Sequence, residues 1–187
     1  MLVPMSNPSR RVVRVYPSRR YLDVLDPSPL DIELYDIAHA LSVIPRYGGH
    51  TAKPYYVGEH ALTVAVYLMR KYGDPELAMC GLHHDDTEYV LGDIVQPVKR
   101  SGELDGYVAL ESRWEQAIAD SLRLPFLPSA LDEVKEADKA VLEMEMTLIR
   151  DNDWRTASAP DSVRQAFLLT HHQLEVAIDE KHNGGPA

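Results

Sequence analysis

The sequence predicts an all-α, single-domain helical bundle with a short extended arm at its N-terminus. A chain of 187 residues that is 45% hydrophobic can bury one sizeable core and needs no second domain. At least six segments space their apolar residues along one face of a helix, and only the arm offers strands. We expect the arm to cover residues 1–27, the bundle residues 28–182 and a loose tail residues 183–187.

The N-terminal arm mixes arginines with apolar residues. Weak alternation on either side of Pro17 favours two short strands or extended pieces. The arginines suit a solvated or subunit-contacting surface better than direct nucleotide contact. They are Arg10, Arg11, Arg14, Arg19 and Arg20. Helical spacing over residues 31–44 then predicts a helix that Pro45 ends.

The loop of residues 45–54 carries groups that suit a nucleotide. Its paired glycines let backbone approach a ligand closely, Arg46 presents a planar fork for phosphate, and Tyr47 presents a ring face for a base. An ordinary turn with an arginine packed on a tyrosine explains the same residues equally well. We assign no role to His50 in this loop.

The next predicted helix, over residues 55–69, carries the single histidine His60 near its start. A lone histidine in such a place is more often a surface or core residue than a ligand. Residues 81–99 then concentrate ionisable groups at a density that an ordinary core helix could not bury without a metal or partners. Asp74 as N-cap, Pro75 in the first turn and Gly92 after the last turn predict a helix over residues 75–91.

Three side chains on this central helix suit metal chemistry. His84 and Glu88 stand at i,i+4, and Asp85 and Glu88 stand at i,i+3, so all three can address one point beside the helix. His84 and Asp85 would supply a nitrogen and an oxygen to a divalent ion. Glu88 would accept a proton from water near the metal.

Two further helices are predicted over residues 103–122 and 129–150, and a last one over residues 160–181. Asp138 and Glu145 fall inside the apolar stripe of the helix over 129–150. A core-facing carboxylate needs a cation, so Asp138 is a candidate metal ligand, and we expect Glu145 to pair with an arginine or lysine. His171 and His172 diverge by about 100° on a helix and cannot share one site, so we expect both to be exposed.

Charge and cysteine content exclude several classes of protein. A formal net charge of −10 argues against a non-specific nucleic-acid binder, because tracking phosphates needs a basic excess. Cys80 is the only cysteine, so no intrachain disulfide can form. We find no apolar run of transmembrane length and no signal-peptide pattern, and we expect a cytoplasmic protein without membrane contact.

The motif His84-Asp85-x-x-Glu88, followed by Gly92-Asp93-Ile94 and Pro97-Val98-Lys99, resembles the HD-domain metal-dependent phosphohydrolase superfamily. Within it, the motif resembles the bacterial 5′-deoxynucleotidases, and phage dATP triphosphohydrolases are similar too. The resemblance runs from about residue 36 to residue 141 and implies an HD-type helical bundle.

The resemblance also assigns roles to other residues. His60, in Val-x-Glu-His-Ala-Leu, corresponds to the first metal histidine, and Asp138 to the distal metal aspartate. Arg46 would meet phosphate, beside Tyr47 where the family usually carries Trp or Phe. Asp93 would contact the sugar and favour deoxyribose, although it could also simply cap the next turn. Lys99 is a candidate phosphate contact, although a lysine after a helix is normally solvated.

Two imidazoles and two carboxylates suit one divalent transition metal, Mn²⁺, Co²⁺, Fe²⁺, Ni²⁺ or Zn²⁺, with Mg²⁺ less suited. One metal is expected because no histidine lies between residues 86 and 170, the region from which the resembling binuclear HD phosphodiesterases draw their extra imidazoles. The implied reaction is water attack on the 5′-phosphate ester of a small-molecule deoxynucleotide, either a mono- or a triphosphate. A non-catalytic nucleotide-sensing module is the alternative. The resembling nucleotidases are commonly oligomeric, which makes a homo-oligomer an expectation as well.

Overall fold

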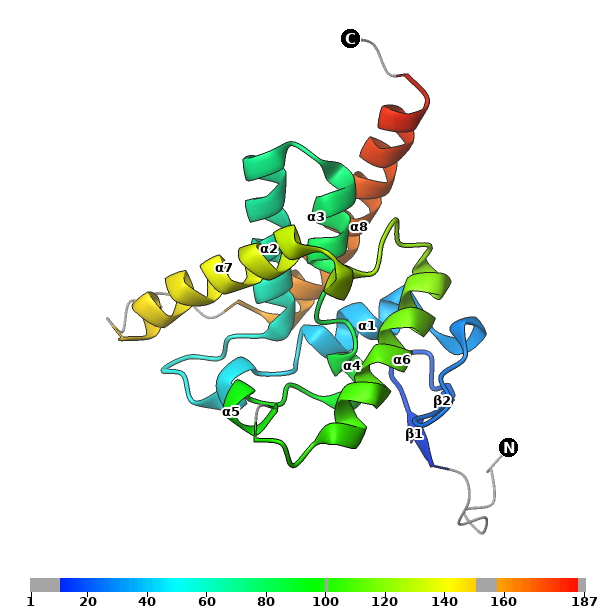
Figure 1. The fold of residues 1–187 in the computed structure, drawn as a ribbon, viewed down its shortest axis with the longest axis vertical. Helices are drawn as coiled ribbons and strands as arrows, with labels where there is room; N and C mark the ends of the chain where they lie inside the picture. The colour runs from blue at the N-terminus through cyan, green and yellow to red at the C-terminus, as the bar shows by residue number, and fades with distance from the viewer. Residues whose placement is uncertain (1–10, 100, 151–157, 185–187) are drawn as a thin grey trace.

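The computed structural model describes residues 11–99, 101–150 and 158–184, and within these residues the fold is all-α, as predicted. Eight α-helices and one two-stranded sheet make up the described part of the chain (Figure 1). In chain order the elements are β1 (Val12–Arg14), β2 (Tyr21–Asp23), α1 (Leu34–Leu41), α2 (Val57–Tyr72), α3 (Pro75–Leu82), α4 (Glu88–Leu91), α5 (Gln96–Lys99), α6 (Asp105–Leu122), α7 (Asp132–Arg150) and α8 (Pro160–His182).

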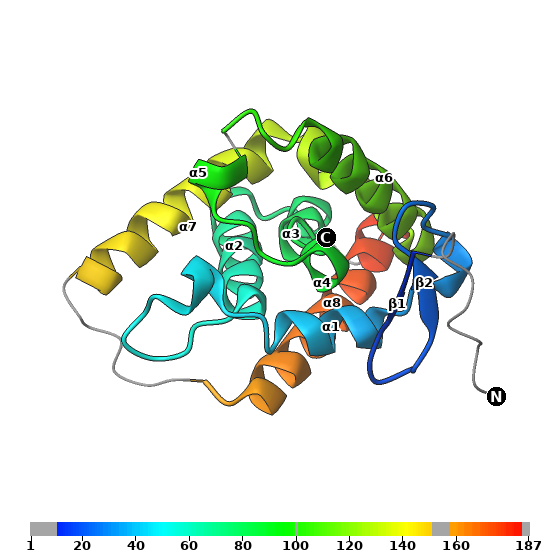
Figure 2. The same ribbon diagram turned by 90° about the horizontal axis from the view of Figure 1, so that it is seen from below.

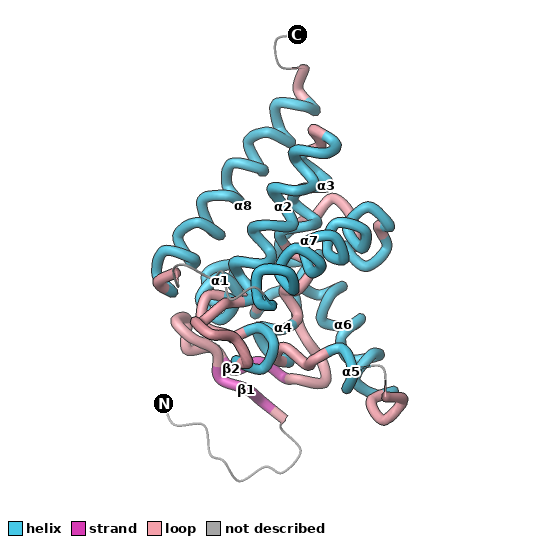
Figure 3. Tube along the Cα trace, turned by 90° about the vertical axis from the view of Figure 1, so that its left-hand side faces the viewer, coloured by secondary structure: helices cyan, strands magenta, loops and turns pink. Residues whose placement is uncertain are grey.

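The core forms where α2 packs against α3, α7 and α8 (Figures 1 and 3). The apolar stripe of α2 is fully buried there, with Ala61, Val64 and Leu68 at 0% exposure. Phe167 on α8 and Trp114 on α6 are equally buried and fill the space between the helices. The apolar face of α2 therefore faces the core.

The N-terminal arm forms the antiparallel hairpin β1–β2, which pairs Val12 with Asp23 and Arg14 with Tyr21. It lies beside α1, at the opposite end of the molecule from α7 (Figures 1 and 2). The buried carboxylate of Asp36 accepts hydrogen bonds from the backbone N and the Oγ of Ser18, at 2.8 and 2.5 Å, and so fixes the hairpin to α1. Arginines 11, 14, 19 and 20 are exposed, and Arg10 lies outside the described residues.

The central helix expected over residues 75–91 is broken in the structure. It starts as predicted, since Pro75 opens α3 and the Asp74 side chain accepts from the backbone N of Glu76. The helix ends at Leu82, turns cover residues 83–87, and α4 begins at Glu88. Within the turns, Nδ1 of His83 lies 2.6 Å from Oδ2 of Asp86, and both side chains are buried. His83 also contacts His171 of α8 at 2.8 Å, and these contacts together outweigh the helix propensity of the segment.

Two other expectations need correction. Helix α1 is shorter than residues 31–44, because Pro29–Asp31 forms a 3₁₀ turn and the chain leaves the helix at Ser42, whose hydroxyl donates to the carbonyl of His39 at 2.7 Å. His171, expected to be exposed, is only 5% exposed, whereas the His172 side chain is exposed as predicted. None of the described helices combines the length and apolar composition that crossing a membrane requires.

Candidate metal centre

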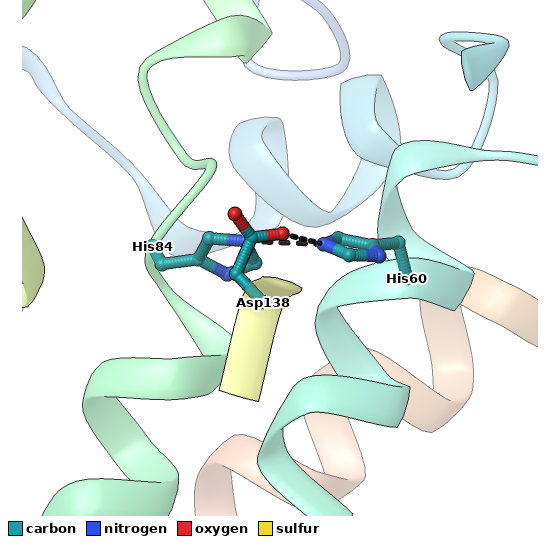
Figure 4. A group of neighbouring side chains, drawn as sticks. All are labelled: His60, His84 and Asp138. Atoms are coloured by element: carbon teal, nitrogen blue, oxygen red, sulfur yellow. Dashed lines mark hydrogen bonds and ion pairs between the residues drawn. The ribbon is translucent and has the colours of Figure 1, made fainter. Parts of the chain in front are cut away.

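Three side chains from three separate elements meet at one point (Figure 4). His60 comes from the first turn of α2, His84 from the turns after α3, and Asp138 from the first half of α7. Their ligand atoms lie within 4.8 Å of one another. Nε2 of His60 is 3.2 Å from Nε2 of His84 and 3.0 Å from Oδ1 of Asp138. This group could hold a metal ion.

The hydrogen bonds on the far sides of both rings explain why the group suits a cation. Nδ1 of His84 lies 2.8 Å from the carbonyl oxygen of Gly81, which can only accept, so this nitrogen carries the hydrogen. Nδ1 of His60 lies 2.7 Å from Oε1 of Glu145 and donates to that carboxylate. If both rings are neutral, each Nε2 atom then carries a lone pair and no hydrogen. These two lone pairs face each other, and that of His60 also faces a carboxylate oxygen of Asp138. A cation among them removes this repulsion.

The separations from Nε2 of His60 to His84 and Asp138 match the spacing of ligands around a single ion, whereas Nε2 of His84 and Oδ1 of Asp138 are 3.8 Å apart. Ligand atoms about 2.1 Å from one metal lie about 3.0–3.5 Å apart for adjacent positions. Asp85 lies beside the group, since its Oδ2 is 3.3 Å from Nε2 of His84 and 3.9 Å from Nε2 of His60. The same oxygen is 3.2 Å from Nη1 of Arg46. Asp85 is thus shared between the histidines and a guanidinium.

Neighbouring opposite charges outweigh burial for three groups of the site. Burial alone would raise the pKa of Asp85, but His84, His60 and Arg46 outweigh burial and hold it well below its usual range. Burial would lower the pKa of His84, but Asp85 and Asp138 raise it well above its ordinary value. Burial would likewise lower the pKa of Arg46, whereas Asp85 and Glu145 raise it. The site therefore strongly favours positive charge at its centre.

A pocket of about 230 Å³ opens beside the three-residue group. It gathers every residue that the sequence analysis assigned to catalysis or substrate, together with Asp85 and Asp138. The residues lining it are Arg46, Tyr47, Asp85, Glu88, Asp93, Ile94, Val95, Gln96, Pro97, Lys99, Asp138 and Leu142. His50 is exposed in the preceding loop and does not line this pocket.

Glu88 is the buried carboxylate of this pocket. It is 4% exposed, and its Oε2 has no hydrogen-bond partner among the described residues. Burial, together with the charges of Asp85 and Asp93, raises its pKa well above the ordinary value for a glutamate. Lys99, 3.9 Å away, opposes this shift only in part, because its ammonium bonds to Glu111 at 3.0 Å. Glu88 therefore has a free oxygen and an elevated proton affinity.

The sequence analysis missed the full environment of Glu145. As expected, this residue meets an arginine, with 3.5 Å between its Oε2 and Nε of Arg46. It also accepts hydrogen bonds from His60 and from the hydroxyls of Tyr47 and Tyr55. Its place in the apolar stripe of α7 was the available signal, but spacing along one helix cannot identify partners about 90 residues away.

A second group of buried histidines was also missed. Nε2 of His83 lies 2.8 Å from Nδ1 of His171 on α8, and the other ring nitrogen of His83 faces Asp86. His171 reaches the surface through Glu175, at 3.4 Å from its Nε2. This chain of contacts fixes the turns that carry His84 and Asp85 to α8. The adjacent pair His171-His172 in the sequence gave no indication that His171 contacts His83.

Comparison with known proteins gives relatives without a described activity. No family model matches the sequence. An uncharacterized protein of Rhodobacter capsulatus is 36% identical over 186 aligned residues, which cover 84% of this chain and 92% of that protein. The uncharacterized protein YfdR of Escherichia coli is 36% identical over 115 residues, which cover 62% of this chain and 60% of that protein.

Proposed function

The chain belongs to the same family as the uncharacterized Rhodobacter capsulatus protein, and from its own site we propose that it is a metal-dependent phosphohydrolase that cleaves the 5′-phosphate ester of deoxynucleotides. One observation carries the proposal: two imidazole nitrogens converge with the oxygen of an aspartate that lines a pocket, and the same pocket holds a buried free carboxylate and a guanidinium. This combination resembles the site of the HD-domain phosphohydrolases.

In this proposal His60, His84, Asp85 and Asp138 hold one divalent transition metal. The donor set of two nitrogens and two carboxylates suits Mn²⁺, Co²⁺, Fe²⁺, Ni²⁺ or Zn²⁺ better than Mg²⁺, which prefers oxygen ligands. A divalent ion there would polarise the phosphate and make water more acidic.

The other residues position the substrate and move the proton. Arg46, held between Asp85 and Glu145, offers its remaining N–H groups to the phosphate oxygens. Glu88 accepts the proton of the attacking water, and its raised pKa makes it a stronger base than an ordinary glutamate. The water oxygen bonds to phosphorus while the bond from phosphorus to O5′ breaks, and O5′ takes the proton held by Glu88 to give the nucleoside and inorganic phosphate.

Substrate selection follows from the pocket walls. Tyr47 would stack on the base, and Asp93 would contact the sugar on the side where a ribonucleotide carries its 2′-hydroxyl. Among the described lining residues only Arg46 and Lys99 are cations, and both are already paired with carboxylates. A monophosphate carries less negative charge than a triphosphate, so it suits a pocket with so few free cationic groups better.

The test is product analysis with purified protein resupplied with Mn²⁺, Co²⁺ or Mg²⁺ and given ribo- and deoxynucleoside mono- and triphosphates. We expect inorganic phosphate from deoxynucleoside monophosphates. Glu88→Gln should retain metal and lose at least about 100-fold in kcat, while Glu143→Gln, at an exposed site on α7, should not differ from the unmodified protein.

Other outcomes would change the proposal in defined ways. Release of inorganic triphosphate from dATP or another deoxynucleoside triphosphate would keep the reaction and replace the substrate. Absence of turnover with metal bound would refute the phosphohydrolase and favour a nucleotide-sensing module that uses the same ligands without catalysis.

A further inference from the structure

The carboxylate of Glu145 touches both halves of the candidate site. It is 3% exposed and lies on α7, two turns after Asp138. Oε1 accepts from Nδ1 of His60 at 2.7 Å and from the hydroxyl of Tyr55 at 2.6 Å. Oε2 accepts from the hydroxyl of Tyr47 at 2.5 Å and lies 3.5 Å from Nε of Arg46.

We propose that Glu145 is a positioning residue that couples the metal centre to the substrate-facing pair Arg46 and Tyr47. The substrate half of this inference rests on the proposed function, whereas the metal half does not.

The metal half follows from the tautomer of His60. A neutral imidazole has one hydrogen, and donation from Nδ1 to Glu145 leaves Nε2 bare and aimed at His84 and Asp138. The His60 ring is fully buried, and Oε1 of Glu145 is the acceptor for its Nδ1 hydrogen among the described residues. Without the carboxylate, the ring would no longer be held in the orientation and tautomer that bind a cation.

The substrate half follows from the backbone of Tyr47. This residue has φ 57° and ψ 27°, a left-handed conformation that is costly for a residue other than glycine. Its hydroxyl is committed to Glu145, and the Arg46 guanidinium lies 5.5 Å from its ring centroid. A ligand in the pocket therefore meets the ring of Tyr47 rather than its hydroxyl. The contact with Glu145 holds that ring in place at the pocket wall.

Because the two oxygens belong to one rigid carboxylate, a movement that shifts the oxygen bonded to His60 also shifts the oxygen bonded to Tyr47. Removing Glu145 should loosen His60 and Tyr47 together, although these two residues come from different elements. A residue that served only to fill the core would weaken stability without a selective effect on metal and nucleotide binding.

The metal arm of the test is a Co²⁺ titration, followed by visible absorption, of the protein stripped of metal. Glu145→Gln keeps the volume, removes the negative charge and replaces one of the two acceptor oxygens by an NH₂ group, so it cannot accept from both His60 and Tyr47. We expect its Co²⁺ affinity to fall by about 10- to 100-fold, with unchanged helical circular dichroism. Glu143→Gln, on the same helix but exposed, should bind Co²⁺ as the unmodified protein does. Equal affinities for Glu145→Gln and the unmodified protein would overturn the inference.

The substrate arm measures equilibrium binding of dAMP to the metal-loaded protein, with no turnover needed. Tyr47→Phe removes only the hydroxyl and should weaken dAMP binding by about 3- to 10-fold. Combined with Glu145→Gln, it should add nothing further, because the contact is already lost. The coupling would be overturned if the losses of dAMP affinity in the two single variants added up fully in the double variant. It would also be overturned if Tyr47→Phe alone bound dAMP as tightly as the unmodified protein, a result that needs no folded Glu145→Gln.

These arms separate the inference from the proposed function. If the unmodified protein hydrolyses no nucleotide, the proposed function fails, yet a loss of Co²⁺ affinity in Glu145→Gln would still establish the metal half. If hydrolysis is found but Glu145→Gln binds Co²⁺ normally, the proposed function stands and the inference fails.

Discussion

At the scale of single residues, the buried histidines differ in what surrounds them. His60 has a carboxylate on each side of its ring, at Glu145 and Asp138. His171 instead faces another imidazole, that of His83, and a half-exposed carboxylate, that of Glu175 at 3.4 Å. Burial and the nearby His83 therefore lower the pKa of His171 to about 4. His171 is held neutral within the fold.

Neutral His171 makes stability sensitive to acid. Because its pKa in the folded state lies below the value of about 6.5 for an unfolded chain, the unfolded state binds more protons between these two values. Stability is then lost as pH falls from about 6.5 to about 4, by at most about 3 kcal/mol from this residue. His171→Gln keeps a polar side chain that can form a hydrogen bond with His83, but it cannot take a proton. Its urea-unfolding free energy should fall less steeply over this pH window than that of the unmodified protein.

Other groups near His171 define the control. The titratable groups that act on it are His83 from the turns after α3 and His172 and Glu175 from its own helix, and Asp86 contacts His83 in turn. His172→Gln removes the adjacent imidazole, whose side chain is 73% exposed, and keeps the buried contact. Parallel pH profiles for His171→Gln and the unmodified protein would contradict the prediction, whatever their absolute stabilities.

At the scale of elements, a glycine sets the distance between α2 and α3. A Cβ on Gly81 would lie 2.3 Å from Cδ1 of Leu68 and 3.2 Å from Cγ1 of Val64. Both of these α2 side chains are fully buried and have no space to move into. The close approach of the two helices therefore depends on the missing side chain. The same approach brings His60 and His84 together, because these residues lie on α2 and just after α3.

Gly81→Ala should destabilise the fold by about 1–3 kcal/mol, because the strain of overpacking exceeds the gain in helix propensity. Gly106→Ala is the matched control, since a Cβ there meets nothing within 4 Å and α6 should gain a few tenths of a kcal/mol or more. Chemical denaturation of both variants gives the comparison. Equal stabilities would show that α3 can shift away from α2 at little cost.

Elements were predictable from the sequence where local rules decide them. The caps at Asp74 and Gly92 and the Pro75 start are local signals, and the structure contains all three. The break after Leu82 was not predictable, because it depends on Asp86 and on a histidine 88 residues away that both bond to His83. The prediction placed His84, Asp85 and Glu88 at one site by assuming a single helix. The three residues still lie close together, because the turns after α3 also keep neighbouring residues near one another.

The candidate site was predictable in part for the same reason. Asp138 was identifiable on physical grounds, because a carboxylate in an apolar stripe needs a cation. His60 was not, because a lone histidine on a helix carries no such signal, and only the resemblance pointed to it. The partners of Glu145 required the fold itself, since Tyr47, Tyr55 and His60 reach it from a loop and a helix far away in the chain.

At the scale of the whole molecule, the candidate ligands join parts of the chain that are distant in sequence. His60 and Asp138 are separated by 78 residues, and the turns that carry His84 are also tied to α8 through His83 and His171. An ion bound by these residues would link α2, the turns after α3, and α7. It would bind the folded chain and not the unfolded one, so binding should stabilise the fold as a unit.

Metal removal should therefore lower the thermal stability of the whole chain in one cooperative step. At a free metal concentration about 100 times Kd, linkage predicts about 2.7 kcal/mol of added stability. We expect Tm to rise with added Co²⁺ or Mn²⁺ and to fall again with EDTA. Asp138→Asn should lose most of this rise, whereas Asp132→Asn, on the same helix, should keep it because that carboxylate is exposed at the surface. A Tm rise that survives Asp138→Asn would place metal binding elsewhere and remove Asp138 from the ligand set.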